Sequence, residues 1–260
     1  MRTVCITGSA SGLGAATRAR LERDGQRVIG VDLHDAEVCT DLSTREGRDA
    51  MVLGVTELSG GVLDGVVAAA GIMGNQPLVV SVNYYGAVAT LHGLRPLLAR
   101  GTDASAVAIS SNSTTTTPGL PMDLVDVIRA GDEAAALEAT SAVPGVFAYP
   151  ASKLALALYV RHHATGPDWI GAGIRLNAIA PGVIETPMTK NDLEFIFSIP
   201  EVFPIPIGRP GRPEEIASLL AYLLSPDAGF FCGSVVFADG GTDAAVRADD
   251  YPTPRSDNLL

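Results

Sequence analysis

The sequence is poor in basic residues relative to acidic ones. It holds 18 Lys and Arg against 29 Asp and Glu, so its formal net charge is −11. Such an acidic chain is poorly suited to neutralise nucleic-acid phosphates or to dock on an anionic membrane surface. We therefore expect neither nucleic acid nor a membrane among its partners.

Cysteine is also scarce. The three cysteines, Cys5, Cys39 and Cys232, are odd in number and far apart. They match neither a disulfide framework nor the ligand spacing of a metal site, so we expect no bound metal. This usage is typical of a reducing compartment. The N-terminus enters an apolar strand at once, without the layout of a signal peptide, which favours a cytoplasmic location.

Charge is missing altogether from the 30 residues between Asp64 and Arg95. A membrane-spanning helix needs about 20 predominantly apolar residues, but Asn75-Gln76-Pro77 interrupts this run and polar residues follow. We interpret the run as a buried strand, a turn and a helix whose surfaces are covered by the rest of the protein.

What the chain does contain is material for a large core, because 47% of its residues are hydrophobic and only 18% are charged. Short β-branched runs alternate with longer helical stretches, which indicates βαβ units and a parallel sheet buried on both faces. Strands are expected at Thr3–Thr7, Arg27–Val31, Glu37–Thr40, Leu63–Ala70, Ala104–Ser110, Ile174–Ile179 and Ser234–Ala238, and helices at Leu13–Arg23, Ser43–Leu58, Ser81–Ala99, Tyr149–His163 and Pro213–Leu224.

The absence of linkers and internal repeats predicts one α/β domain over residues 1–260. Its expected fold class is a doubly wound Rossmann-type sheet of about seven parallel strands with helices on both faces. Two places break the alternation: the second and third strands are too close for a crossover helix, and residues 112–148 form an insertion. A loop composition opens the insertion at Ser113–Pro118, and one or two short helices are expected over Met122–Thr140.

A glycine-rich segment, Thr7-Gly8-Ser9-Ala10-Ser11-Gly12-Leu13-Gly14, follows the first strand and opens the first helix. Glycines let a backbone approach a pyrophosphate closely, and a helix N-terminus offers free N–H groups. Asp32 follows at the end of the second strand, 24 residues after Gly8, as expected for a carboxylate that binds the adenosine ribose. Because this acid repels a 2′-phosphate, we predict NAD(H) rather than NADP(H). The alternative is a turn residue at the strand end.

These residues make the chain resemble the short-chain dehydrogenase/reductase family. The spacing Thr-Gly-x-x-x-Gly-x-Gly is the one that this family uses, and further family motifs recur in order over residues 1–245. They are Asp41-Leu42, Ala68-Ala69-Ala70-Gly71 in place of the usual Asn-Asn-Ala-Gly, Asn83 within Ser81–Gly86, Ile109-Ser110-Ser111, Tyr149-Pro150-Ala151-Ser152-Lys153, Pro181-Gly182 and Asp239-Gly240-Gly241. The resemblance implies an oxidoreductase, and the missing Asn pair implies lost hydrogen bonds in a turn rather than lost activity.

The resemblance also implies roles for residues. Ser111 would hold the substrate oxygen beside Tyr149, and Asn83 would hold a water near Lys153 for proton relay. Ser113 is a second candidate for the serine, because Tyr149 follows Ser111 by 38 residues, far more than in most members. For Asn83 the alternative is a helix residue bonded only to backbone. The residues implied to contact the dinucleotide are Gly8, Ser11, Gly12, Leu13, Gly14, Asp32, Leu33, Asp41, Leu42, Ala69, Ala70, Gly71, Tyr149, Lys153, Pro181, Val183 and Thr186.

Tyr149 and Lys153 are four residues apart, so they share one face of the expected helix. A tyrosine with a pKa near 10 is a poor base at neutral pH. A nearby ammonium, together with the positive charge of an oxidised nicotinamide, favours the phenolate. We therefore expect a lowered pKa for Tyr149, which would exchange a proton with the substrate oxygen. The alternative is an exposed tyrosine and a lysine whose charged end reaches solvent.

Residues 187–210 are rich in Phe, Ile and Pro, where the family carries its substrate lid, which favours an apolar, bulky substrate. The missing crossover helix and the long gap before Tyr149 make the chain resemble, within the family, the bacterial 3α-hydroxysteroid dehydrogenase/carbonyl reductase group. This implies reversible oxidation of a secondary alcohol on a steroid or similar hydrophobic carbonyl compound.

Two other functions stay open. One is an oxidoreductase for another substrate class, namely a cyclic alcohol, a dihydrodiol or a 3-oxoacyl thioester. The other is a nucleotide-sensing protein without catalysis, although such proteins usually lose the Tyr or the Lys. A homodimer or homotetramer is expected, with the insertion either covering or making its interface. Residues 245–260 are expected to form a C-terminal tail.

Overall fold

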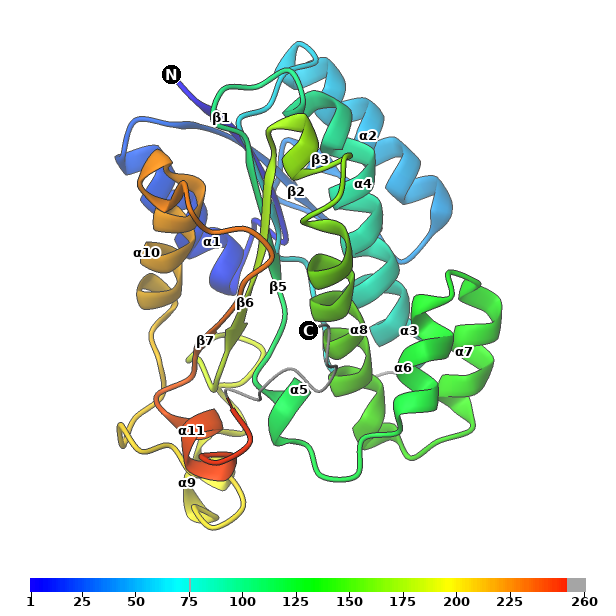
Figure 1. The fold of residues 1–260 in the computed structure, drawn as a ribbon, viewed down its shortest axis with the longest axis vertical. Coiled ribbons are helices and arrows are strands. Elements are labelled where there is room, and N and C mark those ends of the chain that lie inside the picture. The colour runs from blue at the N-terminus through cyan, green and yellow to red at the C-terminus, as the bar shows by residue number, and fades with distance from the viewer. Residues whose placement is uncertain (75, 252–260) are drawn as a thin grey trace, which may run out of the picture.

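The computed structural model describes residues 1–74 and 76–251, so residues 252–260 of the predicted tail at 245–260 lie outside the described residues. Seven parallel strands form one sheet through the middle of the molecule, in the order β3-β2-β1-β4-β5-β6-β7 (Figure 1). The predicted doubly wound fold is confirmed. The strands are β1 (Thr3–Thr7), β2 (Arg27–Asp32), β3 (Val38–Cys39), β4 (Gly65–Ala68), β5 (Ser105–Ile109), β6 (Arg175–Pro181) and β7 (Val235–Ala238).

Helices cover both faces of this sheet (Figure 1). On one face α1 (Gly12–Arg23) packs against α10 (Pro213–Leu224), and on the other lie α2 (Arg45–Ser59), α4 (Ala87–Leu98) and α8 (Ala148–His163). The strands alternate between the two cores. In β1, Val4 and Ile6 point to the side of α1 and α10, and Cys5 points to the other side. Because both faces of the strands are buried, they carry almost no charge.

The carboxyl ends of the strands meet at one edge, and the strand order reverses between β1 and β4. Thr7, the last residue of β1, is level with Val31 of β2 and Ala68 of β4. Open α/β sheets bind their ligands in the crevice at such a switch point. The Thr7 hydroxyl oxygen accepts hydrogen bonds from the amides of Ala69 (3.1 Å) and Ala70 (3.2 Å). These bonds hold the turn at Ala68–Gly71, where Ala68 and Ala69 stand in place of the usual Asn pair.

The predicted helix at Ser81–Ala99 is longer and less regular than expected. It consists of α3 (Gln76–Val80), the π-helix η1 (Ser81–Gly86) and then α4. Single π-helical turns inside α-helices are frequent at functional sites, and this one contains Asn83. The remaining short helices are α5 (Ser113–Thr116), which was wrongly expected to be a loop, α9 (Leu193–Ser198), α11 (Thr242–Val246) and the 3₁₀ turns η3 (Ile170–Ala172) and η4 (Pro226–Ala228).

The insertion at 112–148 is an integral part of the domain. After α5 it forms α6 (Met122–Arg129), α7 (Glu133–Ser141) and the 3₁₀ turn η2 (Gly145–Phe147). Figure 1 shows α6 and α7 on the outer side of α8, and α6 packs on α8 while α7 packs on α3. Leu124, Val125 and Ile128 of α6 are buried in the same core as α4 and α8. The insertion therefore covers part of the face of α8 that would otherwise be open.

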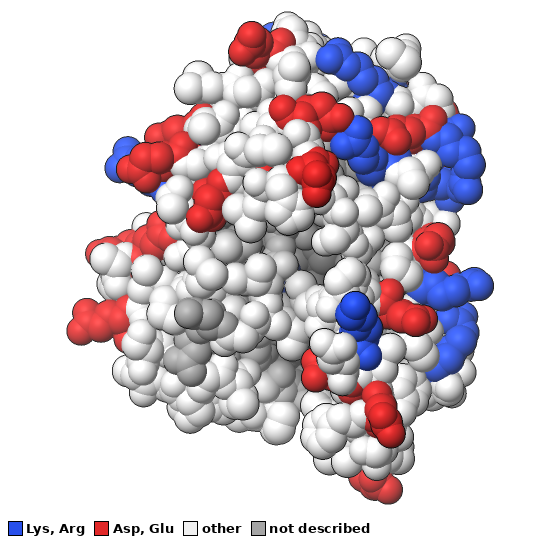
Figure 2. Space-filling view, turned by 180° about the vertical axis from the view of Figure 1, so that it is seen from behind, with Lys and Arg blue, Asp and Glu red and all other residues white. Residues whose placement is uncertain are grey.

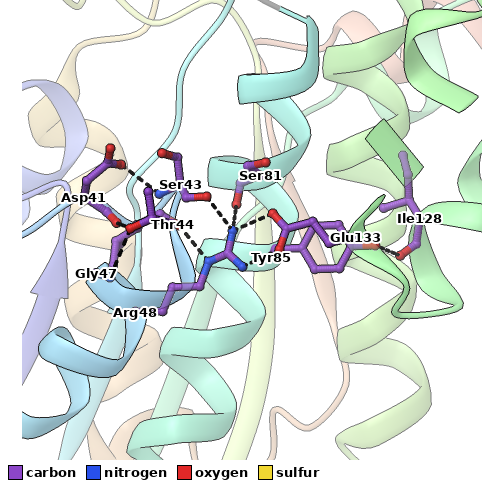
Figure 3. Close-up of polar contacts among 10 residues, drawn as sticks. Asp41, Ser43, Thr44, Gly47, Arg48, Ser81, Tyr85, Ile128 and Glu133 are labelled. Carbon is purple, nitrogen blue, oxygen red and sulfur yellow. Dashed lines mark hydrogen bonds and ion pairs between the residues drawn. The ribbon is translucent and has the colours of Figure 1, made fainter. Parts of the chain in front are cut away.

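One arginine fastens this insertion to the rest of the domain (Figure 3). Arg48 of α2 is 8% exposed and donates two hydrogen bonds to the carboxylate of Glu133 on α7, at 2.6 and 2.7 Å. The same guanidinium donates to the carbonyl oxygens of Leu42, Ser43 and Ser81. A planar guanidinium is suited to such bidentate pairing. It connects the insertion with the loop after β3 and with the π-helix.

The opposite side of the molecule has a hollow in its middle, surrounded mostly by uncharged residues (Figure 2). Basic side chains lie along one margin of this face, among acidic ones, and do not form a continuous basic surface there. Within residues 1–74 and 76–251, no helix combines the length and apolar character needed to cross a membrane.

Candidate active site

The glycine-rich loop between β1 and α1 leaves room for a pyrophosphate. Gly8 has a φ of 71°, and a Cβ placed on it would lie 2.8 Å from the Cα of Ala70. A Cβ on Gly14 would collide with the carbonyl oxygen of Gly8. The N-cap residue of α1, Ser11, makes no capping hydrogen bond with its side chain. The first N–H groups of α1 are therefore free of a capping side chain, which fits an anionic dinucleotide.

This loop opens onto a cavity of about 380 Å³ at the switch point of the sheet. All the residues predicted to contact the dinucleotide line it, except Tyr149 and Val183. The structure adds lining residues that the sequence did not indicate, among them Thr40 and Ile72. They belong to no motif, and only their position after a strand could have indicated them.

Asp32 ends β2 at this cavity, as predicted. Its Oδ2 accepts a hydrogen bond from the amide of Ala10 at 2.9 Å, and its Oδ1 accepts one from the amide of Leu33 at 2.7 Å. These bonds orient the carboxylate and tie it to the glycine-rich loop. Farther along the cavity wall, Asp41 accepts a hydrogen bond from the amide of Ser43 at 2.8 Å.

Ser111, Tyr149 and Lys153 come together on the other side of the switch point, from the end of β5 and the first turns of α8. The Nζ of Lys153 lies 5.7 Å from the centre of the Tyr149 ring. The Ser111 side chain is a hydrogen-bond partner of the Tyr149 hydroxyl. The amide of Ser113 donates to the Oγ of Ser111 at 3.1 Å, so α5 orients this serine. Of the two serines considered, Ser111 is the one that contacts Tyr149.

Burial dominates the electrostatics of these groups. It raises the pKa of the Tyr149 phenol, and the hydrogen bond with Ser111 opposes this rise only in part. Burial also lowers the pKa of Lys153 to about 8, and its Nζ donates to the carbonyl oxygen of Ile109 at 2.9 Å. The pKa of Tyr149 is thus raised, because desolvation of the phenol outweighs its hydrogen bond with Ser111, whereas the expected lowering also counted on the charge of an oxidised nicotinamide. A phenol that keeps its proton is suited to donate it.

Asn83 is fully buried in the π-helix and its amide group is bonded on both sides. Its Oδ1 accepts from the amide of Ile72 at 2.9 Å, and its Nδ2 donates to the carbonyl oxygen of Ile72 at 3.0 Å and to Ser152 Oγ at 3.4 Å. The side chain thus joins the loop after β4 to α8 through backbone groups of Ile72 and the Ser152 hydroxyl. A Cβ on Gly71 would lie 3.3 Å from both Asn83 Oδ1 and Lys153 Nζ, so these two groups meet beside Gly71.

The segment after β6 returns to the glycine-rich loop. A Cβ on Gly12 would lie 3.7 Å from the Cβ of Thr186, which places Thr186 against the start of α1. Val183 lies elsewhere: its carbonyl oxygen accepts from the amide of Gly211 at 2.9 Å, and it lines a separate cavity. Within the predicted lid at 187–210, α9 exposes 63% of Phe195 to solvent.

Comparison with known proteins identifies the family of this fold and site. The chain is 39% identical to the 3-alpha-hydroxysteroid dehydrogenase/carbonyl reductase of Comamonas testosteroni, over 96% of this chain and 100% of that one. It is 30% identical to the levodione reductase of Leifsonia aquatica, over 94% and 95% of the two chains. The chain belongs to the short-chain dehydrogenase/reductase family. A family model described as Enoyl-(Acyl carrier protein) reductase also matches residues 133–243.

A solved structure of this short-chain dehydrogenase/reductase family extends the likeness to the whole fold. The 3-alpha-hydroxysteroid dehydrogenase from Pseudomonas sp. B-0831, complexed with NADH, is 43% identical and superimposes with a TM-score of 0.88, covering 95% of this chain and 99% of that one. The chain is thus an oxidoreductase that acts on alcohol or ketone groups with a nicotinamide dinucleotide. The predicted family and enzyme class are confirmed.

Proposed function

We propose that this short-chain dehydrogenase/reductase interconverts a secondary alcohol and a ketone on a hydrophobic substrate, with NAD(H) as its cofactor. The observation that carries the proposal is that Lys153 lines the same cavity as Asp32, across the switch point, and lies beside Tyr149 and its partner Ser111. This arrangement puts a proton donor and an orienting hydroxyl beside a site that fits a dinucleotide.

When bound, the nicotinamide supplies the hydride for reduction and accepts it in oxidation. In the reductive direction Tyr149 donates its phenolic proton to the substrate oxygen as negative charge develops there. Ser111 donates a hydrogen bond to the same oxygen and holds it beside the phenol. In the oxidative direction the phenolate of Tyr149 takes the proton of the alcohol. Burial raises the pKa of Tyr149, so the side chain is a phenol at neutral pH and has a proton to donate in the reductive direction.

Lys153 supports Tyr149 in this proposal. Its ammonium stabilises the negative charge that remains on the phenol oxygen after the proton has left. Lys153 and Asn83 meet beside Gly71, and a water held there would return a proton to Tyr149 from solvent. Asn83 acts here as a positioning residue, because its side chain fastens the loop that lies beside Lys153.

The choice of NAD(H) depends on Asp32. Its carboxylate, fixed by Ala10 and Leu33, would accept hydrogen bonds from the ribose hydroxyls and repel a 2′-phosphate. The related Pseudomonas dehydrogenase, whose structure contains NADH, supports this choice. The amides of Gly12, Leu13 and Gly14 would hold the pyrophosphate. Asp41, Leu42, Ala69 and Ala70 would line the adenine side, and Pro181 and Thr186 the nicotinamide side.

A steroid or a similar bulky carbonyl compound is the substrate class that the observations favour. The relative from Comamonas is named as a hydroxysteroid dehydrogenase and carbonyl reductase. In the lid segment Phe195, Phe197 and Phe203 are 63%, 37% and 43% exposed, so they are available to contact an apolar ligand. A large apolar contact surface is what a ring system of that size needs for binding.

The test is consumption of NADH by the purified protein with a panel of ketones. The panel contains a 3-ketosteroid, an aromatic ketone, a cyclic diketone and a 3-oxoacyl thioester. We expect turnover of the first two and a strong preference for NADH over NADPH. Turnover of the thioester alone would instead support the class named by the family model, although a net charge of −11 disfavours an acidic carrier protein. NADH binding without turnover of any ketone would support a sensing protein.

A further inference from the structure

A second cluster of charged groups lies next to the ribose side of the cavity, away from Tyr149. Ala10 connects this cluster to the ribose side of the cavity, because its amide donates a hydrogen bond to Asp32 Oδ2 at 2.9 Å. Arg18 is the one basic residue among those that line this shallow depression. The lining residues are Ser9, Ala10, Arg18, Asp35, Ala36 and Glu37.

Arg18 is fully engaged by acids. Its Nη1 and Nη2 donate to the carboxylate of Glu37 at 2.9 and 2.6 Å, and its Nε donates to Glu22 at 2.8 Å. Glu37 also accepts a hydrogen bond from the amide of Gly30 at 2.8 Å. Burial raises the pKa of Glu37, but the bonds from Arg18 and Gly30 outweigh it and hold the pKa below its usual range. The pair is therefore ionised at neutral pH.

Gly30 of β2 makes the space in which these groups meet. A Cβ placed on it would lie 2.8 Å from Arg18 Nη1 and 2.9 Å from Glu37 Oε2, and it would collide with Ser9 Oγ. Ser9 is 3% exposed, and its hydroxyl is buried without a hydrogen-bond partner among the described residues. An unused hydroxyl, a guanidinium nitrogen and a carboxylate oxygen thus lie around the same point beside Gly30.

Stability does not account for this arrangement. The side chains of Arg18 and Glu37 are 27% and 38% exposed, and ion pairs at that exposure contribute little to the free energy of unfolding. A guanidinium with a hydroxyl donor is, however, a donor set that phosphate groups bind well. His34, the basic residue that follows Asp32 by two positions, is paired in the same way, with Asp35 at 2.9 Å.

We propose that Glu37 is a specificity-determining residue that, together with Asp32, excludes a 2′-phosphorylated dinucleotide by occupying the guanidinium of Arg18. The inference rests on the proposed function, because it takes the ribose of NAD(H) to lie at Asp32. In the wild-type protein a 2′-phosphate meets two carboxylates, and the arginine that would bind it is already paired. Neutralising Glu37 frees Arg18, which with Ser9 then forms a phosphate subsite.

The test compares dissociation constants of NADH and NADPH, measured by calorimetry. Glu37→Gln keeps the shape of the side chain and can still accept the Gly30 amide. We expect it to shift the NADPH/NADH affinity ratio toward NADPH by about tenfold, the effect of one charged hydrogen bond. The double variant Arg18→Gln/Glu37→Gln should lose this gain, because the phosphate ligand is gone.

Glu22→Gln is the matched control. It changes the net charge equally and also removes a partner of Arg18, but Glu22 does not line the depression. We expect it to shift the ratio by less than about twofold. An unchanged ratio in Glu37→Gln, an equal gain in Glu22→Gln, or a gain that survives in the double variant would overturn the inference.

The NADPH/NADH affinity ratio measured within one variant is insensitive to partial misfolding. Misfolded protein lowers the amount of bound NADH and NADPH alike. A wild-type protein that binds neither dinucleotide would overturn the proposed function instead. The two failures are therefore distinguishable in the same set of measurements.

Discussion

Among single residues, Tyr149 carries the proton transfer in the proposed reaction. Its hydroxyl is partnered by Ser111, and burial keeps it protonated. Tyr149→Phe removes only this hydroxyl. Because general acid catalysis contributes about 10²–10⁴-fold to a rate, we expect kcat for ketone reduction to fall by that factor while the Kd for NADH changes little.

Tyr159→Phe is the control for that experiment. Tyr159 lies on the same helix α8, 7% exposed and stacked on His163, outside the candidate site. Both variants would be assayed by stopped-flow and by NADH titration. A Tyr149→Phe enzyme as active as the Tyr159→Phe enzyme would remove Tyr149 from its proposed role.

Lys153 makes the reaction sensitive to pH. Burial lowers its pKa from the model-compound value of 10.5 to about 8, so the side chain is an ammonium below that pH and neutral above it. The ammonium is the form that stabilises the phenolate left after proton donation. We therefore expect the rate of ketone reduction to fall as the pH rises through about 8. A pH profile of kcat from 6 to 10 measures it, at roughly one-unit steps.

Lys153→Arg keeps a positive charge at every pH of that profile, because a guanidinium does not lose its proton in this range. The inflection near pH 8 should disappear in this variant, whatever its absolute rate. An inflection that persists would assign the titration to another group.

The residues whose positions the sequence predicts correctly are those that belong to a local motif. Gly8 and Gly14 are needed for close backbone approach, and Asp32 ends a strand at a fixed distance from them. The raised pKa of Tyr149 could not be predicted, because the burial of a side chain depends on elements far away in the chain. For the same reason no motif indicated that Arg18 is paired with Glu37.

Among the helices, most of the long ones are predicted with nearly correct bounds, whereas short ones such as α9 and α11 are not predicted. The helix at Pro213–Leu224 is observed as α10 with the same ends, since Pro at its first position and a run of twelve helical residues define it. By contrast α9 and α11 have six and five residues, too few for a hydrophobic period to show. They are stabilised by tertiary contacts rather than by their own sequence.

The connection between α2 and the insertion can be tested through Arg48. Its guanidinium is buried and holds Glu133 and three carbonyl oxygens (Figure 3). Removing one partner of such an ion pair leaves the other charge without a counter-charge. When both groups are deeply buried, this lowers the free energy of unfolding by about 3–5 kcal/mol. Glu133 is 30% exposed, so we expect Arg48→Met to lower the free energy of unfolding by about 2–3 kcal/mol, measured by urea denaturation.

Arg129→Met supplies the comparison for this variant. Arg129 lies in the insertion as well, but its pair with Asp126 is on the surface, at 3.3 Å with 28% and 69% of the side chains exposed. Its loss should change the free energy of unfolding by less than about 0.5 kcal/mol. Equal effects of the two substitutions would mean that Arg48 does not fasten the insertion.

For the whole molecule, the strand order determines which residues form one site. Asp32 ends β2 and Ser111 follows β5, and the pair β1–β4 lies between these two strands. Two groups that are 79 positions apart in the sequence thus lie at the two sides of one crevice. The alternation of strands and helices predicts the parallel sheet and the right-handed connections, whereas the order of the strands comes from the structure.

The assembly of the protein is a further property of the whole molecule. The insertion covers part of α8, while β7 ends the sheet and the nearby Phe230 is fully exposed. An open sheet edge with exposed apolar residues is commonly covered by a partner. We expect light scattering to give a mass two or four times the 26.8 kDa of the chain. A mass of one chain at micromolar concentration would contradict this expectation.

The place of β1 in the sheet also has a consequence for synthesis of the protein. β1 is the first strand of this sheet to leave the ribosome, yet it lies between β2 and β4, and β4 begins only at Gly65. At about 5–20 residues per second, the apolar strand waits roughly 3–12 seconds for this second neighbour. During that time its backbone has an unpaired side. We therefore expect chaperones that recognise extended apolar segments to bind the nascent chain, although the finished domain buries β1 at its centre.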